Sequence, residues 1–125
     1  METPAHQNHA ILVADDDEAI QLCIKEIAEV EGWDVAFARD GEQCLQRLQS
    51  ERPQLLILDH RMPKMTGEDV LNKLDAIDPK LPVIFMTAER DVERFRGYGQ
   101  IIQLLRKPFD LDAFVSAVNN RIRVS

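Results

Sequence analysis

The sequence predicts an α/β fold: a (βα)5 doubly wound, five-stranded parallel sheet with helices on both faces. Five short apolar runs alternate along the chain with longer amphipathic segments. The runs are unbroken, which is typical of strands buried on both faces of a sheet. Right-handed crossovers between successive parallel strands then place helices on both faces. A polar leader over residues 1–9 precedes the first run, and a single domain is predicted over residues 10–125.

The predicted strands share an abrupt end at polar residues. They cover residues 10–14, 35–38, 55–58, 83–86 and 101–105. Four of them are followed directly or closely by Asp15-Asp16-Asp17, Asp59, Thr87 and Lys107. In a doubly wound sheet, ligands bind outside the carboxyl ends of the strands, so these residues are the candidate functional groups.

The segments between the strands carry apolar residues at three- and four-residue spacing, which predicts helices with one buried face. Gly32 ends the first helix, Asp40 caps the second, Thr66 or Gly67 opens the third, and Asp110 caps the last. The predicted buried faces are Ile20, Cys23, Ile24, Ile27 and Val30; Cys44, Leu45 and Leu48; Val70, Leu71, Leu74 and Ile77; and Leu111, Phe114, Val115, Val118 and Ile122.

The composition limits the classes of partner. The chain has 125 residues, 15 basic and 22 acidic, for a formal net charge of −7. This acidic balance argues against direct binding to nucleic acid or to an anionic membrane. No apolar run approaches the length of a membrane span. The arginines at 90, 94, 96 and 106 are interpreted as a solvated helix face.

Cysteine usage indicates a reducing, cytoplasmic setting. Cys23 and Cys44 lie among apolar residues at helical spacing and are expected to pack as small hydrophobic groups. The sequence has no CxxC motif, no Cys/His cluster and no secretory signal, so neither a disulfide framework nor a zinc site is predicted. His6 and His9 are interpreted as part of the flexible leader.

The polar residues at the strand ends predict a cation site for phosphate chemistry. Two carboxylates a few Å apart repel each other by about 1–4 kcal/mol, so a bound cation is the natural partner. Carboxylate oxygens with a backbone carbonyl suit Mg2+, and Lys107 facing them would bind a phosphate. Asp17 is expected to be a helix N-cap. His60 is expected to point away from Asp59, with no catalytic role.

Other phosphate-binding patterns are absent from the sequence. It contains no GxxxxGK[ST] loop and no GxGxxG motif, which excludes the usual P-loop and dinucleotide sites. The DxDxT nucleophile pattern of dehalogenase-type phosphatases is also absent, since Asp59 is followed by His60-Arg61-Met62.

Together these motifs resemble the response-regulator receiver family of two-component signalling, which has a flavodoxin-like fold. The matching features are Asp15-Asp16 after the first strand, Asp59 followed by Met62-Pro63 and Gly67, Thr87-Ala88, and Lys107-Pro108-Phe109. They occur in the family's order and cover residues 10 to 122. Any one motif is weak, but four in order on the expected strand ends are a specific signal.

The resemblance implies a role for each site residue. Asp59 would be the phosphoacceptor nucleophile, and Asp16 would ligate Mg2+ directly. Asp15 would act mainly through a metal-bound water, and the backbone carbonyl of Arg61 would supply another ligand. Thr87 and Lys107 would each contact a phosphoryl oxygen. The Lys107-Pro108 junction is often cis in this family.

The resemblance also implies a phosphorelay function. A sensor histidine kinase or a histidine phosphotransfer protein would donate the phosphoryl group, and the modified domain would switch conformation to signal to a downstream effector. The protein would be a phosphoacceptor that promotes its own phosphotransfer and dephosphorylation, and not an enzyme. Two alternatives stay open: a receiver-fold interaction module that works without phosphorylation, and a small hydrolase or phosphatase with Asp59 as nucleophile.

Three departures from the family concern the output of the signal. Receivers usually carry Tyr or Phe three residues before the Lys, and here that residue is Leu104. The stretch 89–98 predicts only a short fourth helix, with Val92 and Phe95 as its apolar residues. The usual Gly-Ala before the fifth strand is replaced by residues 97–100, Gly-Tyr-Gly-Gln. Arg61 and Glu89 occupy positions that in this family tune how fast the phosphoryl group is lost.

Overall fold

The computed structural model describes residues 10–88, 90 and 92–122, so the predicted leader lies outside the described residues. Five parallel strands form one sheet in the order β2-β1-β3-β4-β5. The order reverses direction between β1 and β3, which confirms the predicted doubly wound α/β fold. The strands are β1 (Ile11–Ala14), β2 (Val35–Ala38), β3 (Leu55–Asp59), β4 (Val83–Thr87) and β5 (Ile101–Arg106).

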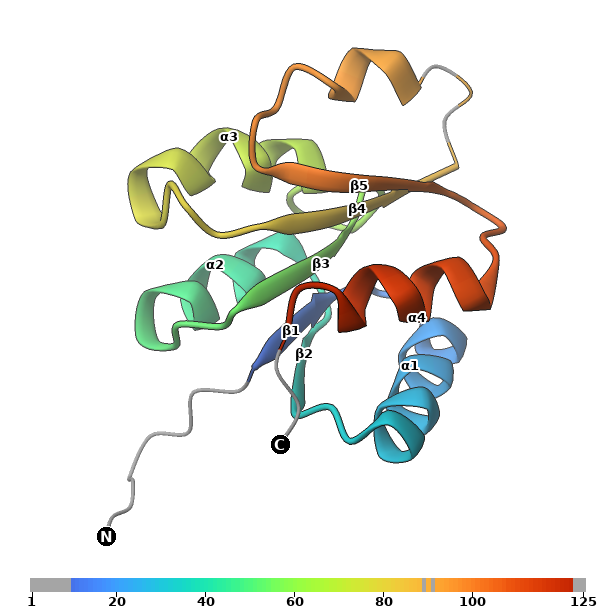
Figure 1. Ribbon diagram of the computed structural model, residues 1–125. Helices are drawn as coiled ribbons and strands as arrows, with labels where there is room; N and C mark the ends of the chain where they lie inside the picture. Colours follow the sequence, from blue (N-terminus) through green and yellow to red (C-terminus); the bar gives the residue numbers. More distant parts are fainter. Residues whose placement is uncertain (1–9, 89, 91, 123–125) are drawn as a thin grey trace, which may run out of the picture.

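Four α-helices connect or follow the strands in the described part of the chain. They are α1 (Glu18–Glu31), α2 (Gly41–Ser50), α3 (Gly67–Ile77) and α4 (Leu111–Asn119). The figure shows α1 and α4 on one face of the sheet and α2 and α3 on the other (Figure 1). None of the helices among the described residues combines the length and the apolar character needed to cross a bilayer.

The helix boundaries follow the predicted capping residues, with one exception. The side chains of Asp17 and Asp40 accept backbone hydrogen bonds at the starts of α1 and α2, and Thr66 forms a capping box at the start of α3. Gly32 ends α1 with φ of 81°, a left-handed conformation that glycine adopts without strain. Asp110 precedes α4 but makes no side-chain capping hydrogen bond with the described residues.

Alternate residues of each strand face two separate apolar cores. In β1, Ile11 and Val13 belong to the core beneath α1 and α4. Leu12 and Ala14 belong to the core beneath α2 and α3. This alternation follows from the two-residue repeat of a strand. It fixes which face each polar residue at a strand end occupies.

The fourth crossover differs from the other three. In place of an α-helix it contains η1 (Val92–Phe95), a 3-10 helix of four residues. This helix lies within the predicted short helical stretch 89–98, of which Glu89 and Asp91 are outside the described residues. Phe95 is fully buried and joins the core beneath α2 and α3.

Three expectations for buried side chains need correction. Leu111, predicted on the buried face of α4, is 49% exposed in the first turn of that helix. Val30 is 84% exposed, although it was predicted on the buried face of α1. It lies two residues after buried Ala28, about 200° around the helix, and so on the opposite side.

Of the two cysteines, Cys44 is buried but Cys23 is only partly buried. Burial, followed by the charge of Asp40, raises the pKa of Cys44 to about 12, so its thiol stays protonated.

Candidate functional site

Two buried aspartates lie side by side at the carboxyl edge of the sheet. Ala14 of β1 pairs with Leu58 of β3, so the next residue of each strand, Asp15 and Asp59, stands at the same level. Asp15 is fully buried and Asp59 is 4% exposed. By strand alternation, both side chains belong to the face that α1 and α4 cover.

A third carboxylate and one ammonium complete the cluster. Asp16 is exposed, and carboxylate oxygens of Asp15, Asp16 and Asp59 lie within 4.8 Å of one another. Nζ of Lys107 lies 2.9 Å from Oδ1 of Asp59 and 3.4 Å from Oδ2 of Asp15. The Lys107–Pro108 peptide is cis, as the resemblance implies. The structure therefore brings four of the predicted site residues together, from three different strand ends.

The electrostatics of the cluster reflect burial opposed by Lys107. The pKa of Asp15 is raised to about 6. Burial is the largest cause and the Asp59 charge acts in the same direction, while the hydrogen bond from the Asp17 N–H and the charge and hydrogen bond of Lys107 oppose the rise. Burial likewise raises the pKa of Asp59, against the hydrogen bond and charge of Lys107. For Lys107, burial lowers the pKa, but the two carboxylates outweigh burial and the pKa is raised. Lys107 therefore stays charged and favours the ionised form of Asp59.

Glycine at position 67 lets the loop after β3 pack against Asp59. The Gly67 N–H donates to the carbonyl of His60 at 2.8 Å. A Cβ atom on Gly67 would lie 2.2 Å from the carbonyl oxygen of Asp59, a distance that no real side chain tolerates. The close approach places the start of α3 directly against the backbone of Asp59 and His60.

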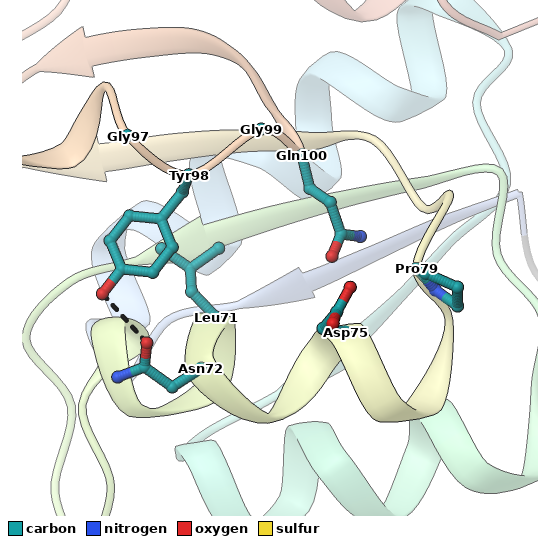
Figure 2. A pocket seen from close by; sticks show the side chains of 8 residues that line it. All are labelled: Leu71, Asn72, Asp75, Pro79, Gly97, Tyr98, Gly99 and Gln100. Atoms are coloured by element: carbon teal, nitrogen blue, oxygen red, sulfur yellow. Dashed lines mark hydrogen bonds between the residues drawn. The ribbon is translucent and has the colours of Figure 1, made fainter.

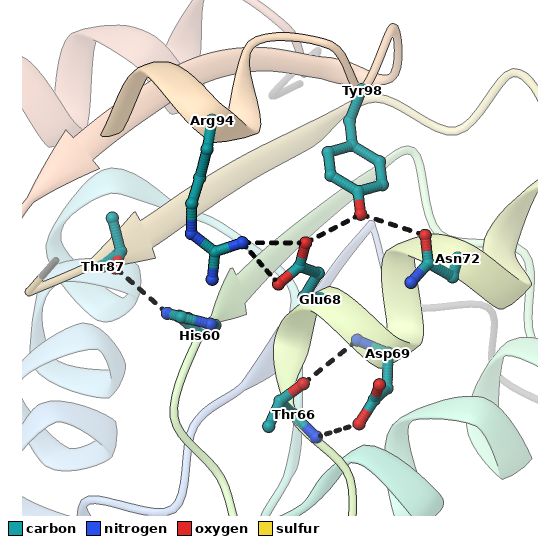
Figure 3. Close-up of polar contacts among 8 residues, drawn as sticks. All are labelled: His60, Thr66, Glu68, Asp69, Asn72, Thr87, Arg94 and Tyr98. Atoms are coloured by element: carbon teal, nitrogen blue, oxygen red, sulfur yellow. Dashed lines mark hydrogen bonds and ion pairs between the residues drawn. The ribbon is translucent and has the colours of Figure 1, made fainter. Parts of the chain in front are cut away.

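Thr87, the remaining predicted phosphate ligand, lies on the other face of the sheet. It follows Val83 and Phe85 in the strand alternation, and both belong to the core beneath α2 and α3. Its Oγ1 lies 3.2 Å from Nδ1 of His60 (Figure 3). Both side chains are buried. The hydroxyl of Thr87 is therefore next to the site but directed to His60 in this conformation.

The carboxylate cluster fits a hard divalent cation. Mg2+ binds oxygen ligands at about 2.1 Å, which places opposite ligands about 4 Å apart. Carboxylate oxygens of Asp15, Asp16 and Asp59 lie within 4.8 Å of one another, so small side-chain movements would let them share one ion. Arg61 and Asp16 line the same hollow of about 320 Å³, so the loop that carries the Arg61 carbonyl borders the cluster. These donors match the preference of Mg2+ for carboxylate and carbonyl oxygens.

For His60 the sequence predicts an orientation but no contact partner. Its expected orientation away from Asp59 agrees with strand alternation, since Leu56 and Leu58 face the core beneath α2 and α3. Its contact with Thr87 was not predicted. Alternation places both residues on the same face, and the pairing of β3 with β4 sets them side by side.

A separate hollow of about 400 Å³ lies between α3 and residues 97–100 (Figure 2). Its lining includes Leu71 and Asp75 of α3 and Tyr98 of the connecting loop. It shares no lining residue with the carboxylate cluster.

The comparison with known proteins identifies the family. Residues 11–119 match the response regulator receiver domain family, and the chain belongs to it. It is 34% identical over 113 residues to sporulation initiation phosphotransferase F of Bacillus subtilis, covering 89% of this chain and 91% of that protein. The chain spans only 46% to 50% of several other curated relatives, which are longer regulators.

Solved structures give the same result. The Francisella response regulator 1452 receiver domain has a TM-score of 0.82 and 31% identity, covering 90% of this chain and 95% of that one. The response regulator TrrA of Thermotoga maritima, solved with Mg2+ and a beryllium fluoride group, has a TM-score of 0.80 and 27% identity, covering 90% and 97%. The chain is a receiver domain of the two-component type, and nothing in these findings favours a phosphorylation-independent module.

Proposed function

We propose that Asp59 accepts a phosphoryl group from a phosphohistidine and that the modified domain signals to a downstream effector. The observation that carries this proposal is the position of Lys107 Nζ, 2.9 Å from Oδ1 of Asp59 in a buried carboxylate cluster. An ammonium at this place neutralises charge on the nucleophile and then on the transferred group. Phosphoryl transfer asks a protein mainly for such positioning and neutralisation.

The transfer follows from the geometry. A carboxylate oxygen of Asp59 forms a bond to phosphorus while the phosphorus–nitrogen bond of the donor imidazole breaks, and the bonding electron pair stays on that nitrogen. Attack needs the ionised form of Asp59, which Lys107 favours against the effect of burial. Lys107 then pairs with the phosphoryl oxygens. The product is an acyl phosphate, which water hydrolyses, so the signal is transient.

Mg2+ is the proposed cofactor, and it would neutralise phosphoryl oxygen charge when bound. Asp15, Asp16, Asp59 and the Arg61 carbonyl would hold it. The TrrA structure with Mg2+ and beryllium fluoride supports this proposal by family relationship. Asp15, fully buried, orients the site by accepting a hydrogen bond from the Asp17 N–H at 2.9 Å.

A sensor histidine kinase or a histidine phosphotransfer protein is the proposed donor. To reach Asp59, the donor surface must cover the residues around Lys107. There the structure has an apolar hollow of about 400 Å³. Its lining includes Ile20 and Cys23 of α1, Phe109, and the half-exposed side chain of Leu111. We propose a cytoplasmic location, where such donors present their phosphohistidine.

We propose that the protein is a phosphoacceptor and not a turnover enzyme. Asp59 is consumed by each transfer and restored only by hydrolysis of its acyl phosphate. The predicted behaviour is stoichiometric labelling, with no turnover of a generic phosphomonoester. Sustained hydrolysis of such a substrate by the pure protein would support the phosphatase alternative.

The experiment that tests the function is intact-mass spectrometry after incubation with acetyl phosphate. Wild type is expected to gain one phosphoryl group in the presence of Mg2+ and none after chelation. The matched variant Asp59→Asn keeps the size of the side chain and removes the nucleophile, so it should gain none. No gain in folded, Mg2+-bound wild type would support an interaction module that acts without phosphorylation.

A further inference from the structure

We propose that His60 transmits the phosphorylation of Asp59 from Thr87 to η1 and α3. The inference rests on the proposed function and names the residue that carries its signal. His60 touches Thr87 on one side of its ring and Phe95 of η1 on another. This chain has Leu104 where receivers usually carry a switching aromatic residue, so the signal needs another route out of the site.

The backbone of His60 is fixed on both sides. Its N–H donates to the carbonyl of Met86 at 2.9 Å, and its own carbonyl accepts from the Gly67 N–H at 2.8 Å. The side chain is 7% exposed. Because the backbone is held by β4 and by the start of α3, the imidazole responds to its neighbours mainly by rotating about its side-chain bonds.

Thr87 is the neighbour that phosphorylation displaces. The phosphoryl group is attached to Asp59 on the face beneath α1 and α4, whereas Thr87 Oγ1 lies 3.2 Å from His60 Nδ1 on the opposite face. For Thr87 to bond a phosphoryl oxygen, its hydroxyl must turn toward the Asp59 side, which lengthens the contact with His60. Two alternative positions of one hydroxyl thus distinguish the two states of the domain.

The ring of His60 is part of an aromatic cluster that includes η1. Its centroid lies 4.9 Å from that of Phe95 at an interplanar angle of 70°, an edge-to-face contact. Phe85 of β4 lies 4.8 Å from Phe95 and 5.7 Å from His60. Phe95 is fully buried and packed against His60. Rotation of the imidazole therefore changes the packing of Phe95 and with it the position of η1.

Polar contacts connect η1 to α3. Nη1 of Arg94 lies 3.0 and 3.1 Å from the two carboxylate oxygens of Glu68, in the first turn of α3 (Figure 3). The hydroxyl of Tyr98 lies 3.0 Å from both Glu68 Oε2 and Asn72 Oδ1. Tyr98 also borders the hollow between α3 and residues 97–100 (Figure 2). A shift of η1 therefore changes the surroundings of the Tyr98 ring.

The test places a fluorine probe at the end of this route. Tyr98 is the only tyrosine in the chain, so 3-fluorotyrosine gives a single 19F resonance. Phosphorylation by acetyl phosphate and Mg2+ should shift it in wild type. In His60→Phe, which keeps a ring but loses the bond to Thr87, the shift should be largely lost, because the ring no longer responds to the position of the Thr87 hydroxyl.

Each spectrum is compared at full labelling, which intact mass measures on the same sample. A full wild-type shift in labelled His60→Phe would overturn the inference, as would an unshifted resonance in labelled wild type. Absence of any label on wild type would instead overturn the proposed function, and the inference with it. Phe95→Leu removes the ring contact with His60 and leaves Thr87 intact, so it should reduce the shift in the same way and covers the case of a poorly folded His60→Phe.

Leu104→Val is the control for the rival route along β5. Leu104 packs against the core beneath α2 and α3 but belongs to β5, not to η1 or β3. Its shortening should leave the Tyr98 shift at the wild-type value. A shift lost in Leu104→Val and kept in His60→Phe would place the route in β5. The fluorescence of Trp33, the only tryptophan and a buried one, checks that each variant is folded.

Discussion

Nζ of Lys107 lies 2.9 Å from Oδ1 of Asp59, although the two residues are 48 positions apart and end different, non-adjacent strands. The side chain of Lys107 is 23% exposed and that of Asp59 is 6% exposed, so the contact is screened only partly by water. It makes Lys107 the group that favours the ionised form of Asp59 against burial, and the group positioned to meet charge arriving on Asp59.

Lys107→Met should slow phosphorylation of Asp59 by about a hundredfold, the usual effect of losing one preorganised group that stabilises transition-state charge. Methionine keeps the length of the side chain and removes its charge. The measurement is the rate of mass gain with acetyl phosphate and Mg2+. Lys107→Arg keeps the positive charge and should slow phosphorylation less than Lys107→Met does. Equal rates in wild type and Lys107→Met would contradict the role given to this contact.

Mg2+ should stabilise the folded protein through the carboxylate cluster. At a concentration about a hundred times its dissociation constant, binding adds about 2.7 kcal/mol to the free energy of unfolding. The measurement is thermal unfolding followed by Trp33 fluorescence during a Mg2+ titration. Asp16→Asn should weaken the response, since Asp16 is one of the three clustered carboxylates. Glu26→Gln removes the same charge from an exposed position of α1 and should leave the response intact.

The positions of these residues could be predicted from the sequence because parallel strands end at one edge of a sheet. Asp15 and Asp59 each end a buried apolar run, and Lys107 follows β5, an edge strand that is only partly buried. The partner of His60 could not be found by spacing alone, since Thr87 lies 27 positions away. The contact between His60 and Thr87 follows from the strand order, which pairs Asp59 with Met86 and so sets the ends of β3 and β4 side by side.

The errors of sequence interpretation have local causes. Val30 fitted a three-residue step from Ile27, but two such steps in succession from buried Ile24 turn the helix by about 600°, which leaves Val30 about 120° away from Ile24 and outside the buried face. Asp110 has the residue type and position of an N-cap without the hydrogen bond, which depends on the side-chain torsion and not on the sequence pattern.

Gly67→Ala should destabilise the protein by about 2 kcal/mol, as overpacking commonly does, because its Cβ would lie 2.2 Å from the carbonyl oxygen of Asp59. The same displacement should slow labelling of Asp59. Urea unfolding followed by Trp33 fluorescence measures the first effect. Gly97→Ala is the matched control, since its Cβ would meet no atom within 4 Å, and it should change stability by less than about 0.5 kcal/mol.

Stability without divalent ions should depend on the ionisation of Asp15. Burial raises its pKa from the ordinary value of 3.8 to about 6. Between these two values the unfolded chain has released a proton that the folded protein still holds, so the free energy of unfolding falls as pH rises and then levels above pH 6. A difference of about 2 pKa units corresponds to at most about 3 kcal/mol. Burial of Asp59 acts with the same sign.

Urea unfolding in EDTA, at several pH values from 4 to 7.5, measures this effect as the difference between wild type and Asp15→Asn. Carboxylates distant from Asp15 titrate in both proteins and cancel in the difference. Asp15→Asn has no proton to lose at this position. Its free energy of unfolding relative to wild type should therefore increase as the pH rises from 3.8 to about 6 and stay constant above that range. A difference independent of pH would mean that Asp15 is ionised in the folded protein throughout, held so by Lys107 at 3.4 Å.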